Sequence, residues 1–208
     1  MKQKEKTQHS RDKILQAATA EFRAKGYQAT SINIICSANG ISKGLIYHNF
    51  KNKDELYLIC MKMCFHAITT YLKSTEYMSE NVQLSIRNYL HLRQTFFQEH
   101  PHYGSLFFQA LLYPPKHLSD EIRSIRHEFD AFNIECYKKL LGQVELRDGI
   151  TDDLALEYFT LFQEIFNGYF QKRALEDHNV TALAEEHELN LTKILDFILY
   201  GIAKEELS

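Results

Sequence analysis

The polar side chains best suited to binding chemistry lie close together, in the segment 42–53. Ser42 and Lys43 stand at the predicted start of a short helix, where free backbone amides and the helix dipole attract anions such as phosphate. His48 and Asn49 follow in the same helix, and both carry hydrogen-bonding groups that can reach the edges of nucleic-acid bases. The chemistry that these residues offer is recognition of a polyanion.

Motifs of the common enzyme classes are missing. The two Glu-x-x-His motifs of the di-iron bundles are missing, because only one such spacing, from Glu99 to His102, occurs. His127 and His187 each precede a glutamate but lack the second histidine of the zinc-protease motif. The sequence has neither a phosphate-binding glycine loop nor a nucleophile elbow. We therefore expect no enzymatic activity, no catalytic residues, no metal site and no cofactor.

The net charge of −3 conceals an uneven distribution. Residues 1–53 carry ten lysines and arginines against three acidic residues, a net charge of +7, whereas the rest of the chain carries a net charge of −10. A basic segment on an acidic body indicates that the segment meets a polyanion. A solvated basic tail would explain the lysines among the first six residues, but not Lys43, Lys51 and Lys53.

The composition predicts an all-α globular protein. Apolar residues make up 45% of the 208 residues, and only 3 prolines and 8 glycines interrupt helix propagation. No apolar run approaches the ~18 residues that span a bilayer, and no apolar segment follows the charged N-terminus as in a signal peptide. The four cysteines have neither zinc-site spacing nor the density of a disulfide scaffold. We expect a cytoplasmic protein without a membrane partner.

Four helices must position the polar segment. Apolar spacing predicts the first from Ser10 to Lys25, with Ser10 as its N-cap and Gly26 in a left-handed conformation at its end. Thr30 or Ser31 caps a short second helix that stops at Asn39-Gly40. The residues on the inner face of the first helix are Ile14, Leu15, Ala18 and Phe22.

The turn after the second helix is typical of a helix-turn-helix. Gly40 permits a tight turn, Ile41 can fold back between the helices, and Ser42 caps a helix over 43–49. Asn52, with Glu55 three residues later, resembles a capping box at the start of a fourth helix that runs to about residue 75. Further helices are predicted over about 82–100, 103–112, 119–142, 151–174 and 185–204.

A longer pattern in residues 11–56 resembles the N-terminal signature of the TetR/AcrR family of bacterial regulators. The resemblance covers about a quarter of the chain without gaps. Ile34 departs from it where an acidic residue is usual, and Leu45 stands where Thr or a small residue is frequent. The matching residues are Arg11, Ile14, Leu15, Ala17, Ala18, Phe22, Gly26, Tyr27, Thr30, Ser31, Gly40, Ile41, Ser42, Lys43, Gly44, Ile46, Tyr47, Phe50, Lys53 and Leu56.

The resemblance implies that helix 43–49 lies in the major groove of double-stranded operator DNA. Gly44 lets the backbone approach closely, and Tyr47 suits a phosphate or a thymine methyl group. Lys53, and Thr30 or Ser31, are expected to contact phosphates, which position the protein while base contacts specify the site. The expected DNA-binding residues are Thr30, Ser31, Ser42, Lys43, Gly44, Leu45, Tyr47, His48, Asn49 and Lys53.

Several of these residues have a plain structural interpretation as well. Tyr47 could pack against the first helix, and Leu45 could be merely exposed or could contact a thymine methyl group. We interpret Lys51 as a solvated surface charge and not as a specific contact. Ile46 and Phe50, spaced i and i+4, are predicted to be core.

The resemblance divides the chain into a DNA-binding domain, residues 1–53, and a ligand-binding and dimerisation domain, residues 54–208. Segments such as 158–170 are apolar on more than one face and must bury two sides. We expect a homodimer built on a four-helix bundle with the last helix. Its two recognition helices would lie about 34–36 Å apart on a near-palindromic operator.

The family also implies an effector cavity, which we expect to bind an apolar or aromatic small molecule and release a repressor from its operator. An aromatic stripe at helical spacing is more often plain core, which is the favoured interpretation of any single one of these residues. A regulator without a metabolite ligand, either architectural or controlled by a protein partner, is the alternative. The candidate ligand-binding residues are Phe108, Phe129, Phe132, Phe162 and Phe166.

Cys60 and Cys64 lie one helical turn apart, a spacing that could serve a redox switch. Buried free cysteines are common in cores, and we interpret these two as core residues.

Overall fold

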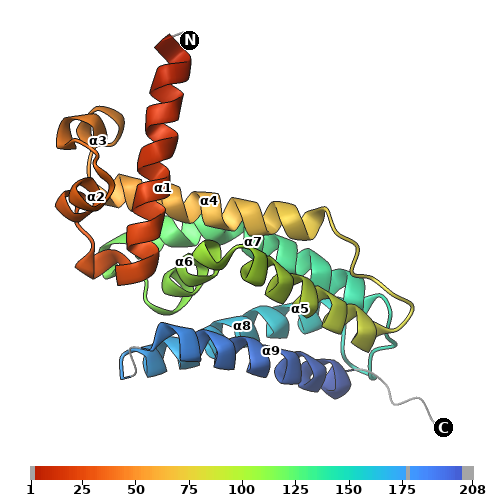
Figure 1. Ribbon diagram of the computed structural model, residues 1–208. Coiled ribbons are helices and arrows are strands. Elements are labelled where there is room, and N and C mark those ends of the chain that lie inside the picture. Colours follow the sequence, from red (N-terminus) through yellow and green to blue (C-terminus); the bar gives the residue numbers. More distant parts are fainter. Residues whose placement is uncertain (1–2, 177–178, 203–208) are drawn as a thin grey trace.

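The structure is a computed structural model and describes residues 3–176 and 179–202. Its elements in this part of the chain are helices without a strand, which confirms the all-α prediction (Figure 1). Met1, Lys2 and Lys204 lie outside the described residues. The elements are α1 (Gln3–Ala29), α2 (Ile32–Asn39), α3 (Lys43–Asn49), α4 (Lys53–Lys73), α5 (Val82–Glu99), α6 (Pro101–Leu112), the 3₁₀ helix η1 (Lys116–Leu118), α7 (Ser119–Leu141), α8 (Asp152–Ala174) and α9 (Val180–Ile202).

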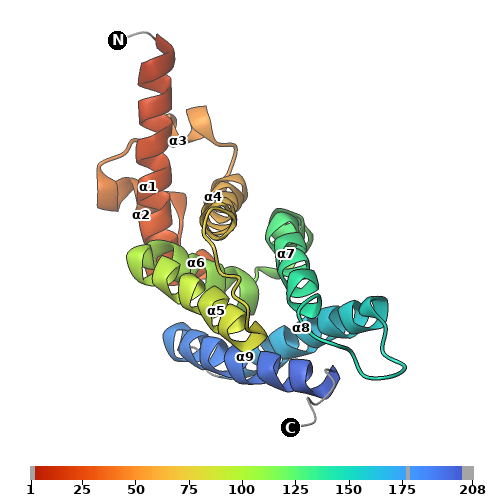
Figure 2. The same ribbon diagram turned by 90° about the vertical axis from the view of Figure 1, so that its right-hand side faces the viewer.

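Helices α1, α2 and α3 form a small three-helix unit, which we call the reading head. The N-terminal half of α1 projects beyond the rest of the molecule, beside α3 (Figures 1 and 2). Ile14, Ala18 and Phe22 are fully buried, as the apolar spacing of α1 predicts. Ser10 is not the N-cap, because the helix already begins at Gln3 and Ser10 lies within it.

Gly26 marks the end of the regular part of α1. Its backbone has a φ of +72°, a value that side-chain-bearing residues rarely adopt, so glycine is needed there. The positive φ was predicted, but the chain resumes helical hydrogen bonding as far as Ala29 before α2 begins. Ser31 then caps α2, accepting a hydrogen bond from the amide of Ile34 at 3.2 Å.

The helix-turn-helix has the predicted turn chemistry. Gly40 adopts a left-handed conformation after α2, and buried Ile41 follows it. Ser42 caps α3 by accepting from the amide of Leu45 at 3.2 Å. Asn52 caps α4 as predicted, but the carboxylate of Glu55 accepts from the amide of Lys51, at 2.5 Å, instead of completing a capping box with Asn52.

Helix α4 joins the reading head to the C-terminal helices. It contacts α1 on one side, and α5, α6 and α7 on the other. A lower layer of α8 and α9 packs against α5, α6 and α7 (Figures 1 and 2). The main hydrophobic core is continuous from Ile14 in α1 to Leu199 in α9. None of the described helices is long and apolar enough to span a membrane.

The start of helix α9 differs from the sequence prediction. Helix α9 begins at Val180 and not near Glu185, and its last described residue is Ile202. Asn179 accounts for the earlier start, since its side chain accepts a hydrogen bond from the amide of Ala182 at 3.1 Å. Helix α4 ends at Lys73, close to the predicted limit.

Candidate nucleic-acid interface

Helix α3 has one buried face and one exposed face. Ile46 is fully buried and Phe50, its C-cap, is 2% exposed, as predicted for core residues. Tyr47 is 57% exposed, so packing against α1 is excluded as the role of its ring. We define the outer face of α3 as the exposed residues Lys43, Gly44, Tyr47 and His48.

The exposed N-terminus of α3 is suited to an anion. Ser42 is exposed, and Lys43 directly follows it. A β-carbon built on Gly44 would meet no atom within 4 Å, so the backbone is open to an approaching partner on this side. Free amides at a helix start, a lysine and an open backbone together form a surface that can accept a phosphate group.

Arg11 fixes α3 against α1, a role that the sequence analysis did not identify. Its guanidinium donates to the backbone carbonyl of Asn49 at 3.0 Å and lies 4.4 Å above the ring of Phe50. The contact spans 38 residues of sequence, so only the tertiary structure could reveal the partner. Arg11 therefore orients α3 relative to the projecting half of α1.

Two residues of α3, Asn49 and Leu45, are less accessible for contact with DNA than predicted. Asn49 is half-buried, and its side-chain amide donates to the carbonyl of Leu45 at 2.8 Å, so it points back along its own helix. Leu45 is half-buried and packs against the core, so it is not simply exposed. Bidentate pairing of Asn49 with adenine would have to compete with the bond inside the helix.

The predicted phosphate contact by Thr30 is wrong for its side chain. Thr30 is 1% exposed, and its hydroxyl donates to the backbone carbonyl of Glu21 at 3.2 Å. Ser31 is half-buried and serves as the N-cap of α2. A threonine or serine before a helix can be a cap or a ligand contact, and only the packing of the turn decides which residue takes the cap.

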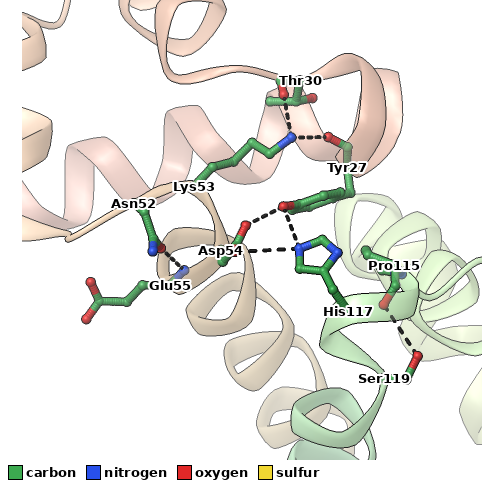
Figure 3. Close-up of polar contacts among 9 residues, drawn as sticks. All are labelled: Tyr27, Thr30, Asn52, Lys53, Asp54, Glu55, Pro115, His117 and Ser119. Atoms are coloured by element: carbon green, nitrogen blue, oxygen red, sulfur yellow. Dashed lines mark hydrogen bonds and ion pairs between the residues drawn. The ribbon is translucent and has the colours of Figure 1, made fainter.

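Lys53 points into the junction behind the reading head (Figure 3). Its ammonium donates to the backbone carbonyls of Tyr27, at 3.0 Å, and Thr30, at 3.1 Å, and lies 3.8 Å above the Tyr27 ring. Burial lowers the pKa of Lys53, although the nearby Asp54 carboxylate opposes this shift. Two of its three N–H groups are already engaged, so it joins α4 to the turn between α1 and α2.

The same junction extends to the C-terminal helices. The Tyr27 hydroxyl donates to the Asp54 carboxylate and lies 3.1 Å from Nε2 of His117, which is 3.5 Å from the second Asp54 oxygen (Figure 3). Burial and the Asp54 carboxylate both raise the pKa of Tyr27. Tyr27, Asp54 and His117 thus link α1, α4 and η1.

The predicted ligand residues do not surround one common space. Phe108, Phe129, Phe132 and Phe166 are all buried, and Phe162 is partly buried. Phe108 and Phe166 lie against His187, whereas Phe129 lines a separate groove of about 300 Å³ between α4 and α7. The five candidate phenylalanines are therefore parts of an aromatic core.

A buried ion pair interrupts this aromatic core. Arg93 of α5 donates to Glu188 of α9 at 2.8 Å, and both side chains are at most 10% exposed. Burial alone would raise the pKa of Glu188, but Arg93 and His187 outweigh it and hold that pKa below its usual value. The pair could not be predicted from the sequence, because its partners lie 95 residues apart.

The cysteines lie in the core, as interpreted from the sequence. Cys60 and Cys64 are fully buried, and burial raises the pKa of the Cys60 thiol to about 11. The pKa of Cys64 is also raised, mainly by burial, and its thiol donates to the Tyr103 carbonyl at 3.3 Å. Protonated, inaccessible thiols react poorly with oxidants.

Comparison with known proteins shows a match between the N-terminal part of the chain and one family. Residues 14–59 match the sequence model of the bacterial regulatory proteins, tetR family. The chain is 29% identical over 109 residues to YhgD, an HTH-type transcriptional regulator of Bacillus subtilis, covering 48% of this chain and 57% of YhgD. It is 27% identical over 131 residues to IcaR of Staphylococcus epidermidis, the HTH-type negative transcriptional regulator of the biofilm operon icaADBC, covering 63% of this chain and 67% of IcaR.

The fold extends the match over nearly the whole chain. SmeT, the repressor of the Stenotrophomonas maltophilia multidrug efflux pump SmeDEF, superposes with a TM-score of 0.60 at 18% identity, covering 97% of this chain and 94% of SmeT. By sequence, the chain spans between about half and two thirds of the two relatives. YhgD, IcaR and SmeT are all regulators by description. In its sequence match over residues 14–59 and in its overall fold, the chain is similar to the tetR family of bacterial regulatory proteins.

Proposed function

We propose that this protein is a DNA-binding transcriptional regulator that recognises its operator with the outer face of α3. The observation that carries this proposal is the exposure of Tyr47, Lys43 and His48 on a helix whose opposite face is anchored by Ile46. Such a helix offers polar side chains to the major groove while its inner face stays in the core. A protein that reads chromosomal operators works in the cytoplasm.

The dimer that this function requires is expected to form through α8 and α9. Helix α8 exposes large apolar side chains along one stripe, with Tyr158 and Ile165 each 61% exposed and Tyr169 54% exposed. On α9, Phe197 is 79% exposed. A contiguous apolar surface of this kind favours burial against a second copy. Two-fold symmetry then presents two α3 helices to the half-sites of a near-palindromic operator.

Repression relieved by a small molecule is the mode of action that we infer. IcaR is a negative regulator and SmeT a repressor by description, which supports repression here. One solved relative in fold, FadR of Bacillus subtilis, is described in complex with stearoyl-CoA. The proposed region for an apolar effector is the aromatic core around Phe108, Phe166 and His187. The effector would bind to a conformation in which these side chains are packed differently, and it would increase the population of that conformation.

Selection of bound duplexes from a random DNA library, followed by anisotropy titration, tests the DNA-binding proposal. We expect a near-palindromic site, about tenfold weaker binding by Tyr47→Ala, and a salt slope smaller by about one for Lys43→Gln. Lys138→Gln, an exposed lysine of α7, is the matched control and should leave both quantities unchanged. Unchanged binding by Tyr47→Ala and Lys43→Gln would show that DNA is read by another surface.

The same titration, repeated with a library of lipophilic compounds, separates an inducible repressor from a regulator without a metabolite ligand. A compound that weakens the operator complex should also raise the melting temperature of the free protein. A broad library with no such compound would remove the support for induction.

A further inference from the structure

A large groove lies between the end of α1 and the C-terminal helices. Its volume is about 1330 Å³, ample for a small organic ligand. Its walls come from the end of α1, from α6, from η1 and the loop before it, and from the facing ends of α8 and α9 (Figure 1). It is separate from the aromatic core, because none of the five candidate phenylalanines lines it.

The charged side chains among the described lining residues of this groove are all basic. Arg23, Lys25, Lys116 and Lys172 line it together with His117, and the described lining residues include no aspartate or glutamate. Lys25 is partly neutralised by its ion pair with Glu21 at 2.7 Å, whereas Arg23, Lys116 and Lys172 are exposed. This distribution runs against the acidic character of the C-terminal part of the chain, and a concave wall of one sign concentrates counter-ions.

Apolar and polar groups complete the lining. Leu112, Pro114 and Leu175 provide apolar surface between the cations. Gln109 is 7% exposed, and its amide nitrogen donates to the Arg23 carbonyl and to the Ser105 hydroxyl, each at 3.2 Å. Its Oε1 is buried and accepts no hydrogen bond from any described group. A buried acceptor in a groove wall suits a ligand that also carries a donor.

From these features we infer that the groove is a binding site for an amphipathic anion, a small molecule with a phosphate, sulfonate or carboxylate group on an apolar body. The cations would hold the anionic group, and the leucine and proline side chains would cover the apolar body. This site is distinct from the proposed effector region and does not depend on it.

A ligand bound in this groove would lie where it influences DNA binding. Tyr27 and His117 both line the groove and both belong to the junction that joins α1, α4 and η1. The groove also touches α8, next to the proposed dimer surface. A ligand bridging these elements would favour one position of the reading head relative to the C-terminal helices, which is what a coupling between two sites requires.

Calorimetric titration of the full chain, without DNA, tests the site directly. The probes are octyl phosphate, octyl glucoside with the same apolar chain but no charge, and inorganic phosphate with the charge but no chain. We expect measurable binding of octyl phosphate that weakens with added salt, and at least tenfold weaker binding of the other two. Equal binding of octyl phosphate and octyl glucoside, or of octyl phosphate and inorganic phosphate, would overturn the proposal.

A pair of double variants localises the binding. Arg23→Gln with Lys116→Gln should weaken octyl phosphate binding roughly fivefold, as expected for two exposed cations. Arg87→Gln with Lys138→Gln removes the same two residue types at exposed positions outside the groove and should change binding less than twofold. Equal affinities of the two double variants would place the anion elsewhere and refute the groove as its site.

Binding of octyl phosphate to the free protein and affinity for operator DNA are measured in separate experiments. Octyl phosphate that binds the free protein through Arg23 and Lys116 establishes the site even if operator DNA is not recognised. In that case only the proposed function would fail. A change in operator affinity on adding octyl phosphate, absent in the Arg23→Gln, Lys116→Gln variant, would establish the coupling.

Discussion

At the scale of single residues, Lys53 has two possible roles, a phosphate contact and a structural contact within its own chain. Its position in the family signature implies a phosphate contact, but its ammonium donates to the carbonyls of Tyr27 and Thr30. A lysine bound to two carbonyls of its own chain stabilises the fold of that turn. Phosphate binding would use only the remaining N–H group or would have to release these bonds.

We therefore expect Lys53→Met to lower the free energy of unfolding by about 1–2 kcal/mol, because the carbonyls lose a charged donor while the aliphatic stem is kept. Lys51→Met, an exposed neighbour, should change it by less than 0.5 kcal/mol, roughly the limit for surface substitutions. Urea denaturation measures both. The salt slope of operator binding should stay the same in Lys53→Met; a slope smaller by about one would instead favour the phosphate role.

At the scale of elements, α5 and α9 are held together by a charge pair inside an apolar core. Arg93 and Glu188 are both buried, and His187 lies beside Glu188 with its own pKa lowered, chiefly by burial. Such a pair contributes little net stability over an apolar replacement, but removing one partner leaves an unpaired buried charge. The ion pair therefore sets the alignment of α5 against α9 more than it adds to the stability of their contact.

We predict that Glu188→Gln costs about 3–5 kcal/mol of stability, whereas Arg93→Met with Glu188→Leu restores most of it. The lowered pKa of Glu188 in the folded protein also has a consequence in acid. Stability from this carboxylate is fully present above its unfolded pKa of about 4.3 and is lost as pH falls through the lower folded pKa. Thermal unfolding between pH 3 and 6 should show this loss in the natural sequence and a smaller loss in the double variant. Equal acid sensitivity would argue against the pair.

At the scale of the whole molecule, the exposed stripe on α8 is the feature that a single chain leaves unexplained. Its apolar side chains are exposed, and α8 itself belongs to the lower layer in Figures 1 and 2. Burying them in a dimer would join two reading heads into one unit. The spacing of those heads on DNA would then depend on the dimer surface and on the junction at Tyr27 and His117.

We expect Ile165→Lys to shift the protein toward monomer in sedimentation velocity, because a charge would be buried in the proposed interface. Operator affinity should fall with it, since each monomer then binds only one half-site. Leu84→Lys, which replaces an apolar residue of α5 that is 47% exposed, is the control and should leave the sedimentation coefficient unchanged. A variant Ile165→Lys that sediments like the natural protein would move the dimer surface elsewhere.

The sequence by itself determined the local features. The buried face of α1, the caps Ser42 and Asn52, the turn at Gly40 and the core roles of Ile46 and Phe50 all follow from spacing and backbone preferences over a few residues. The helix-turn-helix depends on such local preferences, and so it was predictable. Ser10 was misread as a cap because a capping residue inside a longer helix has the same local signal.

Only the tertiary structure decided which side chains face each other across long separations. It turned Thr30 and Lys53 inward, brought Arg11 to the carbonyl of Asn49, and paired Arg93 with Glu188. It also gathered cations from α1, η1 and α8 around one groove. Hydrogen bonds and charge pairs depend on distance in space and not on spacing in sequence. A single sequence therefore contains the residues that form these bonds but does not reveal which of them are in contact.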